Sequence, residues 1–297
     1  MKKETTAKVL MAVAMLTFGT LAPFVRMVSV TSGELALYRA VMAAVLVGGF
    51  LLITKQKLSI GSVKRELALL LLSGAAMGFN WILLFEAYKY TTVSVATLSY
   101  YFAPVIVMVV CPLLFKEKLT GKEILCFVMA TAGLVLITGT AGGGGSDLLG
   151  IAFGLGAAVL YATVMLLNKF IKGVTGLQRT FVQFIAAIVV LVPYVALTGG
   201  FTLGGLNTEG WVALLVLGVV HTGITYCMYF TALKDLPGRE VAILSYIDPL
   251  VAVLVSVLWL GEDMSVPQII GGLLILGFTL FSELPIKRTN KTDLNNK

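Results

Sequence analysis

Charge is scarce in this chain, and so are the side chains that build most catalytic and metal sites. Only 12% of its 297 residues are charged and 58% are hydrophobic, which is too apolar for an ordinary soluble domain. It has a single histidine, His221, and three cysteines, Cys111, Cys126 and Cys227, whose spacing fits neither a metal site nor a disulfide framework. We therefore expect no cofactor and no metal site, and we interpret the cysteines as small packing residues.

The P-loop that binds nucleotide phosphates is also missing. The segment "LTGKEI" contains Gly-Lys but lacks the upstream glycine and the Ser or Thr that should follow the lysine. The connections between the apolar runs are short, so no segment is large enough for a separate nucleotide-binding domain. Any uphill work by this protein is therefore expected to use gradients rather than ATP.

Long apolar runs dominate what is present. Each is long enough to cross the roughly 30 Å of hydrocarbon in a bilayer as a helix. We expect helices rather than barrel strands, because the runs do not alternate and a helix satisfies its own backbone hydrogen bonds in lipid. The predicted fold class is an all-α polytopic membrane protein with ten transmembrane helices, at residues 8–29, 33–53, 67–88, 92–115, 121–139, 148–170, 177–198, 210–232, 239–260 and 266–284.

The first of these runs has a basic start that resembles a signal peptide. Its apolar stretch continues to about Val30, and it contains no convincing small-residue cleavage site. We therefore expect it to be the first transmembrane helix.

The positive charges predict an orientation. With the N-terminus inside, 19 of the 22 Lys and Arg residues fall in inside segments, and Lys89 is the only one in an outside loop. This positive-inside pattern predicts a multi-pass protein of the cell (plasma or inner) membrane with both termini in the cytoplasm. It also explains the net charge of +7 without nucleic acid, which we do not expect as a partner.

An internal repeat relates the two halves of the chain. The phrase "SYYFAP" ends at Pro104 and "LSYIDP" ends at Pro249, so Tyr101 falls on Tyr246 when the two prolines are aligned at an offset of 145 positions. A capping box pairs Ser or Thr with Glu or Gln three residues later at a helix start. Helix starts recur at nearly the same offset, with predicted capping boxes at Thr31–Glu34, Thr120–Glu123, Thr175–Gln178 and Ser265–Gln268.

Each half holds five helices, and because five is odd, the second half must enter the membrane upside down relative to the first. We predict a first repeat at residues 1–140, a second and inverted repeat at 147–286, and a basic cytoplasmic tail at 287–297. Inverted repeats of this kind are the architecture of secondary transporters. The two prolines should bend or loosen the fourth and ninth helices, because proline removes a backbone donor and clashes with the preceding turn.

These features together resemble the EamA type of the drug/metabolite transporter superfamily. The second half carries an acidic residue before Pro249, then "LGE" and a glycine-rich last helix, as in that family; the first half departs, with Ala103 in place of the acid and "FKEK" in place of "LGE". The resemblance implies a transporter, since family members are mostly exporters or exchangers of amino acids, other metabolites and drugs.

Asp248 lies close to the centre of the ninth predicted helix. Placing a charged side chain there costs about 2.5 to 3.5 kcal/mol on insertion scales, so its presence needs a reason. Either it faces a wet central cavity and binds a proton or a substrate ammonium, or it is a packing feature that stays protonated and hydrogen-bonded to a neighbouring helix. The sequence leaves both interpretations open.

Other polar and aromatic side chains fall at membrane depth. His221, Thr225 and Tyr229 are spaced to form one stripe of the eighth helix, and Thr225 corresponds to Asn80 of the third. Arg39 corresponds to Gln183, and we expect it to snorkel or to pair with Glu34 or Glu86. The candidate substrate-binding residues are Asn80, Trp81, Tyr100, Tyr101, Tyr161, His221, Thr225, Tyr229, Ser245 and Asp248.

The leading hypothesis is a secondary active transporter that exports small metabolites such as amino acids by alternating access. The runner-up is proton-coupled export of cationic or lipophilic drugs, with Asp248 as the anionic partner and aromatic side chains for cation–π contact. A membrane-embedded enzyme or a receptor belongs to a different class; enzyme sites usually cluster His, Asp or Glu, and this sequence does not. The expected partners are a small-molecule substrate, a coupling proton and the lipid bilayer, with the protein a monomer or weak dimer.

Overall fold

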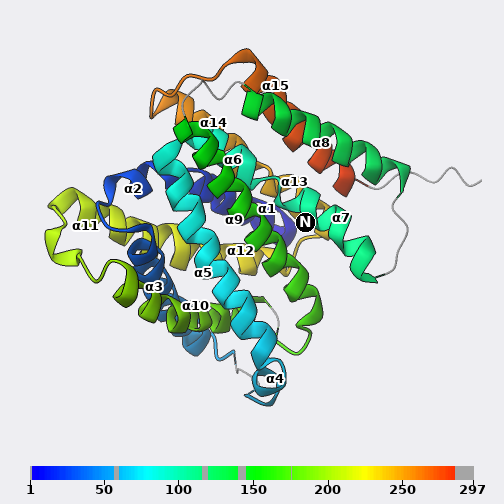
Figure 1. The fold of residues 1–297 in the computed structure, drawn as a ribbon. Helices are drawn as coiled ribbons and strands as arrows, with labels where there is room; N and C mark the ends of the chain where they lie inside the picture. Colours follow the sequence, from blue (N-terminus) through cyan, green and yellow to red (C-terminus); the bar gives the residue numbers. More distant parts are fainter. Residues whose placement is uncertain (1, 57–59, 116–119, 140–144, 175, 285–297) are drawn as a thin grey trace, which may run out of the picture.

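The chain folds into a bundle of helices whose breaks and crossings position its polar side chains (Figure 1). The structure, a computed structural model, describes residues 2–56, 60–115, 120–139, 145–174 and 176–284, and these contain helices and no strand. The spans of the first half are α1 (Lys2–Gly19) with α2 (Leu21–Met27), α3 (Ser32–Ile53), α5 (Leu67–Tyr90), α6 (Val93–Tyr100) with α7 (Ala103–Phe115), and α8 (Gly121–Gly139). Those of the second half are α9 (Gly145–Phe170), α10 (Gly176–Thr198), α11 (Thr208–Leu215) with η2 (Val216–Ile224) and α12 (Thr225–Leu233), α13 (Gly238–Ser245) with α14 (Ile247–Leu258), and α15 (Val266–Glu283).

Ten apolar spans are therefore present in the described part of the chain, as predicted. Nine helical segments of the described chain are long and apolar enough to cross a membrane, and the ninth span contributes a shorter apolar helix at Ile243–Leu258. The first span runs from Lys3 to Met27, as one helical segment with a break at Thr20. Two short elements, α4 (Ile60–Arg65) and η1 (Leu203–Gly205), lie in connections between spans.

The repeated prolines break the fourth and ninth spans, which confirms that prediction. Tyr101 and Phe102 lie in a turn between α6 and α7, and Tyr246 separates α13 from α14. The breaks precede Pro104 and Pro249 because each proline lacks the amide proton that would bond the carbonyl four residues earlier. Each span is thus two half-helices joined at mid-length.

The capping prediction is correct at two starts and partly wrong at a third. Ser265 forms a complete capping box with Gln268, and Thr120 forms one with Glu123. Thr31 accepts the backbone N–H of Glu34, but the carboxylate of Glu34 bonds elsewhere and does not return to Thr31. Thr175 and the predicted tail 287–297 lie outside the described residues.

Matching helix crossings show that the two halves are structural repeats. A Cβ built on Gly78 of α5 would lie 3.1 Å from Leu191 of α10, and one built on Gly223 of η2 would lie 2.3 Å from Leu46 of α3. Gly223 follows Gly78 by 145 positions and Leu191 follows Leu46 by the same number. The crossing of α5 with α10 is therefore repeated by the crossing of η2 with α3. The first half of the chain supplies the glycine in the former, and the second half supplies it in the latter.

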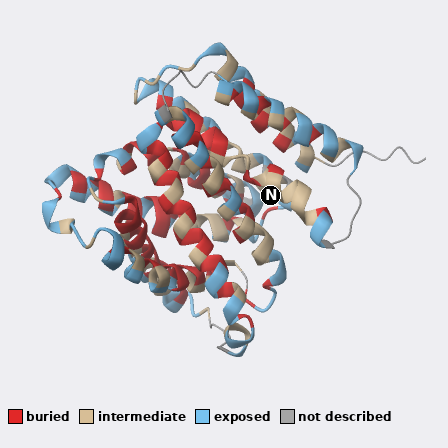
Figure 2. Cartoon of the chain, viewed as in Figure 1, coloured by how far each residue is buried: buried red, intermediate tan, exposed pale blue. Residues whose placement is uncertain are grey.

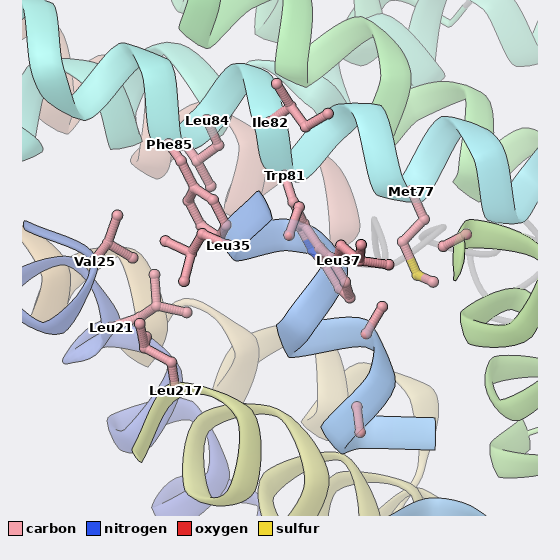
Figure 3. Packing of buried hydrophobic residues seen from close by; sticks show 14 of the residues in the cluster. Leu21, Val25, Leu35, Leu37, Met77, Trp81, Ile82, Leu84, Phe85 and Leu217 are labelled. Atoms are coloured by element: carbon pink, nitrogen blue, oxygen red, sulfur yellow. The ribbon is translucent and has the colours of Figure 1, made fainter. Parts of the chain in front are cut away.

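The largest apolar core lies where these crossings meet. Figure 3 shows Trp81 and Phe85 pointing from α5 toward Leu35 and Leu37 of α3, with Leu217 of η2 in the same cluster. Figure 2 shows buried residues gathered in the middle of the bundle. In contrast, α8 and α15 lie side by side at one margin (Figure 1), and only 22% of the residues in the most apolar stretch of each helix are buried. Exposed apolar surface at that margin is what lipid contact requires.

Two sides of the bundle can be distinguished. We call the side on which α1 begins the near side and the opposite side the far side. On the near side, Glu66 accepts hydrogen bonds from the backbone N–H groups of Gly173 at 2.9 Å and Lys172 at 3.1 Å. This contact joins the connection before α5 to the connection before α10, and so links the two halves.

The Glu66 link predicts an acid-sensitive component of stability. The N–H of Gly173, helped by that of Lys172, lowers the pKa of the Glu66 carboxyl below its ordinary value. A lowered pKa gives stability that is present above the unfolded value and is lost as pH falls through the folded one. We expect the melting temperature to fall on acidification below about pH 4.5, and Glu66→Gln to flatten that fall. Thermal unfolding in detergent, with the exposed Glu209→Gln as control, measures it; an unchanged slope in Glu66→Gln would contradict the link.

A labelling experiment tests the inverted topology. Lys89 and Lys234 are equivalent positions, 145 apart and both exposed, at the ends of α5 and α12. Because five spans separate them, single cysteines placed at Lys89 and Lys234 in a cysteine-free background should react from opposite sides of the membrane. Lys89→Cys should label from outside and Lys234→Cys from inside, measured with an impermeant maleimide. Labelling of both from one side would refute the arrangement.

Candidate functional site

The two repeated phrases meet in the structure. The hydroxyl of Tyr101, at the break between α6 and α7, donates a hydrogen bond to Oδ2 of Asp248 at the start of α14. Both side chains are half-buried although they lie midway along their spans. The carboxylate of the second half is therefore held by the phenol of the first, at the point where both broken helices change direction.

Tyrosines gather around this junction. The rings of Tyr100 and Tyr101 are 5.6 Å apart, and Tyr161 of α9 stacks on Tyr100 at 5.2 Å. Tyr226 and Tyr229 of α12 flank Phe230, with ring separations of 6.2 and 5.0 Å, and both lie within electrostatic reach of Tyr161. These tyrosines retain partial or greater exposure, Tyr161 at 37%. We call Tyr100, Tyr101, Tyr161, Tyr226 and Tyr229 the tyrosine cluster.

Arg39 is buried in the middle of the bundle, and its predicted pairing is wrong. Its Nε donates to Oγ1 of Thr222 at 2.6 Å, its guanidinium carbon lies 4.6 Å from the centre of the Trp81 ring, and the residue is 4% exposed. Glu34 instead accepts from Thr202, and Glu86 forms an ion pair with Lys89 at 2.8 Å. Five residues of helix place Glu34 and Arg39 on different faces of α3, so they cannot meet.

The eighth span contains a π-helix that the sequence analysis did not predict. Over Val216–Ile224, the hydroxyls of Thr222 and Thr225 donate to the carbonyls of the residues five positions earlier, Leu217 and Val220. Nε2 of His221 lies 3.1 Å from Oγ1 of Thr20, at the break between α1 and α2. π-Helices occur frequently at functional sites, and this one carries the hydroxyl that contacts Arg39.

The predicted site residues separate into two groups. The structure brings Tyr100, Tyr101, Tyr161, Tyr229 and Asp248 to the tyrosine cluster, and Trp81 to Arg39. The polar groups of the others bond to protein atoms, and their role in substrate binding stays a prediction. Asn80 donates to the carbonyl of Ala157 at 2.6 Å and Ser245 to that of Val241 at 2.8 Å, while His221 and Thr225 are buried with the contacts described above.

The far side is closed by contacts that join the two halves. Arg26 at the end of α2 forms an ion pair with Glu262, in the turn before α15, at 2.5 Å. Glu262 also accepts the backbone N–H of Val93 at 2.8 Å and the hydroxyl of Ser256, and Arg26 donates to the carbonyl of Tyr88 at 3.1 Å. We call the Arg26–Glu262 pair and these bonds the far-side lock.

The half-helices diverge toward the near side. On the far side α6 packs against α14, so the outer halves of both broken spans are in contact. Beyond the breaks, α7 packs against α8 and α9, whereas α13 packs against α1 and α15. The tyrosine cluster and Asp248 thus lie where contacting half-helices separate.

A groove elsewhere on the surface is not the site we assign. It has a volume of about 490 Å³ and lies between α1, α3 and α12. Its lining is apolar apart from Cys227 and Thr231, and Ile53 and Val45 at its edge are 83% and 69% exposed. Such a surface suits lipid contact rather than recognition of a polar molecule. Among the described residues, no group of three or more His, Cys, Asp or Glu could hold a metal ion.

Comparison with known proteins identifies the family. The model of the EamA-like transporter family matches the chain twice, at residues 5–139 and 148–283. The chain belongs to the EamA-like transporter family. It is accordingly a multi-pass membrane protein of the drug/metabolite transporter superfamily, with ten all-α spans in two inverted repeats.

Several relatives of this EamA-like protein are transporters without an assigned substrate. The uncharacterised transporter YxxF of Bacillus subtilis (strain 168) is 28% identical over 277 residues, which cover 92% of this chain and 88% of YxxF. The threonine/homoserine exporter RhtA of Salmonella typhimurium (strain SL1344) is 28% identical over 145 residues, 48% of each chain. A crystal structure with 18% sequence identity matches with a TM-score of 0.62, over 93% of this chain and 96% of its own, and shows the same fold.

Two features of this EamA-like protein were not predicted from its sequence. The far-side lock joins Arg26 to Glu262, which are far apart in the chain, and no local pattern pairs them. The sequence did single out Arg39, because placing a lone arginine inside an apolar span is costly in free energy. Its ring contacts, however, depend on how α3 crosses α5.

Proposed function

We propose that the protein is a secondary active transporter that exports small metabolites such as amino acids by alternating access. The observation that carries this proposal is the bond between Tyr101 and Asp248, where broken helices of two inverted halves meet. Discontinuous helices that meet at the interface of inverted repeats commonly form the substrate site of secondary transporters.

The packing of the half-helices suggests how access alternates. The far-side lock holds α6 against α14, while α7 and α13 follow different neighbours toward the near side. This is the arrangement of a state closed on the far side. Because the halves are structural repeats, exchanging their conformations would open the lock and bring α7 and α13 together. The breaks at Tyr101–Phe102 and Tyr246 are the hinges that such an exchange needs, since their backbones are already free of the helical pattern.

Asp248 is proposed to couple transport to a proton or to bind a substrate ammonium. Its carboxylate sits among half-buried tyrosines rather than in a dry apolar core, and its hydrogen bond to Tyr101 spans the two halves. Adding a proton would remove the charge and weaken the electrostatic part of that contact. A change of charge at the hinge is a direct way to bias the two conformations.

We propose the cell membrane as the setting of the protein. The positive-inside pattern supports insertion in the cell membrane with both termini in the cytoplasm. Export is supported by the description of its relative RhtA as a threonine/homoserine exporter. We propose a monomer or weak dimer in the bilayer, with a small molecule and a coupling proton as partners, no nucleic acid and no enzymatic activity.

A second candidate function is proton-coupled export of cationic or lipophilic drugs. The tyrosine cluster favours it, since aromatic faces attract organic cations and Asp248 offers a counter-charge. The two candidates differ in what the substrate must carry, because an amino acid brings a carboxylate and a drug of this class does not.

Flux in proteoliposomes tests the proposal. Purified protein is reconstituted, loaded with an unlabelled amino acid, and diluted into the labelled compound with and without an imposed pH gradient. Counterflow that depends on the protein, and accumulation that follows the gradient, are the expected results. A parallel panel of organic cations tests the second candidate. If none of the amino acids or cations moves, secondary transport of small metabolites is contradicted.

A further inference from the structure

We propose that Arg39 binds the carboxylate group of the transported molecule, so that the substrate is a small amino acid or related monocarboxylate. This inference rests on the proposed transport function and assigns the substrate's chemical class. No pattern in the sequence predicts a substrate contact at Arg39. The position of its guanidinium in the folded protein is what suggests one.

The guanidinium of Arg39 has N–H donors that the protein does not use. Nε is used by Thr222 at 2.6 Å, but the terminal nitrogens have no hydrogen-bond partner among the described residues. Some side-chain nitrogen and oxygen atoms of the described residues are fully buried and have no hydrogen-bond partner. No atom of Arg39 is among them. Its terminal nitrogens therefore reach accessible space, although the residue as a whole is 96% buried (4% exposed).

The positive charge also lacks a counter-charge within the described structure. None of the ion pairs that these residues form includes Arg39, and the nearest acidic candidates are engaged elsewhere. Glu34 accepts from Tyr38 and Thr202, Glu86 pairs with Lys89, and Asp248 accepts from Tyr101. A buried charge is kept in proteins when it is paired, and here the pair must be completed by a bound molecule.

The shape of the group selects a carboxylate. A guanidinium presents parallel N–H donors that match the two oxygens of a carboxylate. The guanidinium carbon of Arg39 lies over the Trp81 ring at 4.6 Å and over the Phe85 ring at 5.5 Å, so two aromatic rings take up part of the space around the cation. These rings stabilise the cation without neutralising it.

The surroundings favour a molecule with one negative group. Tyr88, Tyr100 and Tyr226 each lie close enough to interact electrostatically with both Arg39 and Asp248. Two members of the tyrosine cluster, Tyr100 and Tyr226, are thus near both a cation and a carboxylate. A multivalent anion such as phosphate would meet one cation, Arg39, and would be repelled by the carboxylate of Asp248. An amino acid can instead place its carboxylate at Arg39 and the rest of the molecule against the rings.

A purely structural role for Arg39 makes different predictions. In that case the bond to Thr222 would exist only to hold the π-helix, and its loss would destabilise the protein. If Arg39 is instead a binding group, removing an unpaired buried charge should leave the ligand-free protein as stable as before or more so. The two roles are separated by measuring unfolding and ligand affinity on the same variants.

The test uses the full-length protein purified in detergent. Ligand-induced shifts in melting temperature and equilibrium binding are measured for the twenty amino acids, acetate and lactate, with L-threoninamide and L-phenylalaninamide as analogues that lack the carboxylate. Sodium chloride and phosphate are included to detect a site for inorganic anions. Arg39→Gln removes the charge, and Arg39→Lys keeps the charge but loses the planar fork. Gln183→Leu is the matched control, because Gln183 is the repeat equivalent of Arg39 and bonds Ser73 and Asn168.

The expected result is binding of at least one carboxylate by the parent protein, with its amide at least about tenfold weaker. Arg39→Gln should lose affinity by about 10- to 100-fold without a fall in the melting temperature of the ligand-free protein, and Arg39→Lys should be intermediate. Gln183→Leu should lower the melting temperature and keep the affinity.

Three outcomes would overturn the proposal. The first is equal binding of an acid and its amide, and the second is unchanged affinity in Arg39→Gln. The third is that the protein binds no carboxylate in the panel, or binds chloride or phosphate more tightly than every carboxylate. Flux of organic cations separates this failure from failure of the proposed function, since a protein that moves cations and binds no carboxylate is still a transporter. Absence of any flux would contradict both.

Discussion

Replacing Asp248 with Asn should abolish gradient-driven accumulation while sparing some passive exchange. Asparagine keeps the shape of the side chain and can still accept a hydrogen bond from Tyr101, but it cannot take up and release a proton. If Asp248 carries the coupling charge, the carrier can still change conformation with substrate bound, yet the gradient no longer biases the cycle. Folding should be nearly intact, because a neutral amide is easier to bury than a carboxylate.

The measurement compares counterflow with accumulation under an imposed pH gradient, in the same proteoliposomes. Tyr101→Phe removes the donor but not the acid, and should weaken coupling less than Asp248→Asn. Asp147→Asn, which changes a half-buried carboxylate at the start of α9, is the matched control for loss of one negative charge. Asp248→Asn with parental accumulation under every gradient would show that the acid is structural, and His221 would be the next residue to test.

Breaking the far-side lock should shift the protein toward a state open on that side. Glu262 holds Arg26, the N–H of Val93 and the hydroxyl of Ser256. The side chains of Arg26 and Glu262 are 33% and 11% exposed, so the pair lies between a surface and a buried ion pair. We expect Glu262→Gln to cost about 1–2 kcal/mol in the closed state, a five- to thirtyfold change in the ratio of the two conformations.

Accessibility of the hinge reports this shift. Ser245→Cys places a thiol at the end of α13, next to the break, in a background without the three native cysteines. Impermeant maleimide applied from the far side should label it faster in Glu262→Gln than in the parent. Arg26→Gln should act similarly, and the double variant should add little because both remove one interaction. Glu86→Gln, which breaks the local pair with Lys89, is the control; equal labelling rates in all variants would show that the lock does not govern access.

These experiments address the parts of the structure that local sequence patterns do not encode. Arg39 illustrates the difficulty, since its cost in an apolar span was evident but its partner was not. Its predicted partners, Glu34 and Glu86, are engaged by Thr202 and Lys89. The choice of Thr222 and Trp81 instead depends on the crossings of α3 with η2 and α5, which are set by packing at glycines such as Gly223.

The sequence by itself determined the features that arise within one helix or from exact repetition. Hydropathy over about 20 residues defines a span. Proline chemistry determined the breaks before Pro104 and Pro249, and the 145-residue offset with five helices per half determined the inversion. The acid in the middle of the ninth span was visible for the same reason, because a single charge in an apolar run is a local signal.

Only the tertiary structure decided which side chains share a site. The bond of Tyr101 to Asp248, the pairing of Arg26 with Glu262 and the burial of Arg39 against Trp81 all join residues from different helices. The π-helix at Val216–Ile224 belongs to this class too, since its turn is widened where Thr222 meets Arg39 and His221 meets Thr20. Such contacts depend on the angles and heights at which helices cross, and those are fixed by the sum of many packing contacts rather than by any one segment.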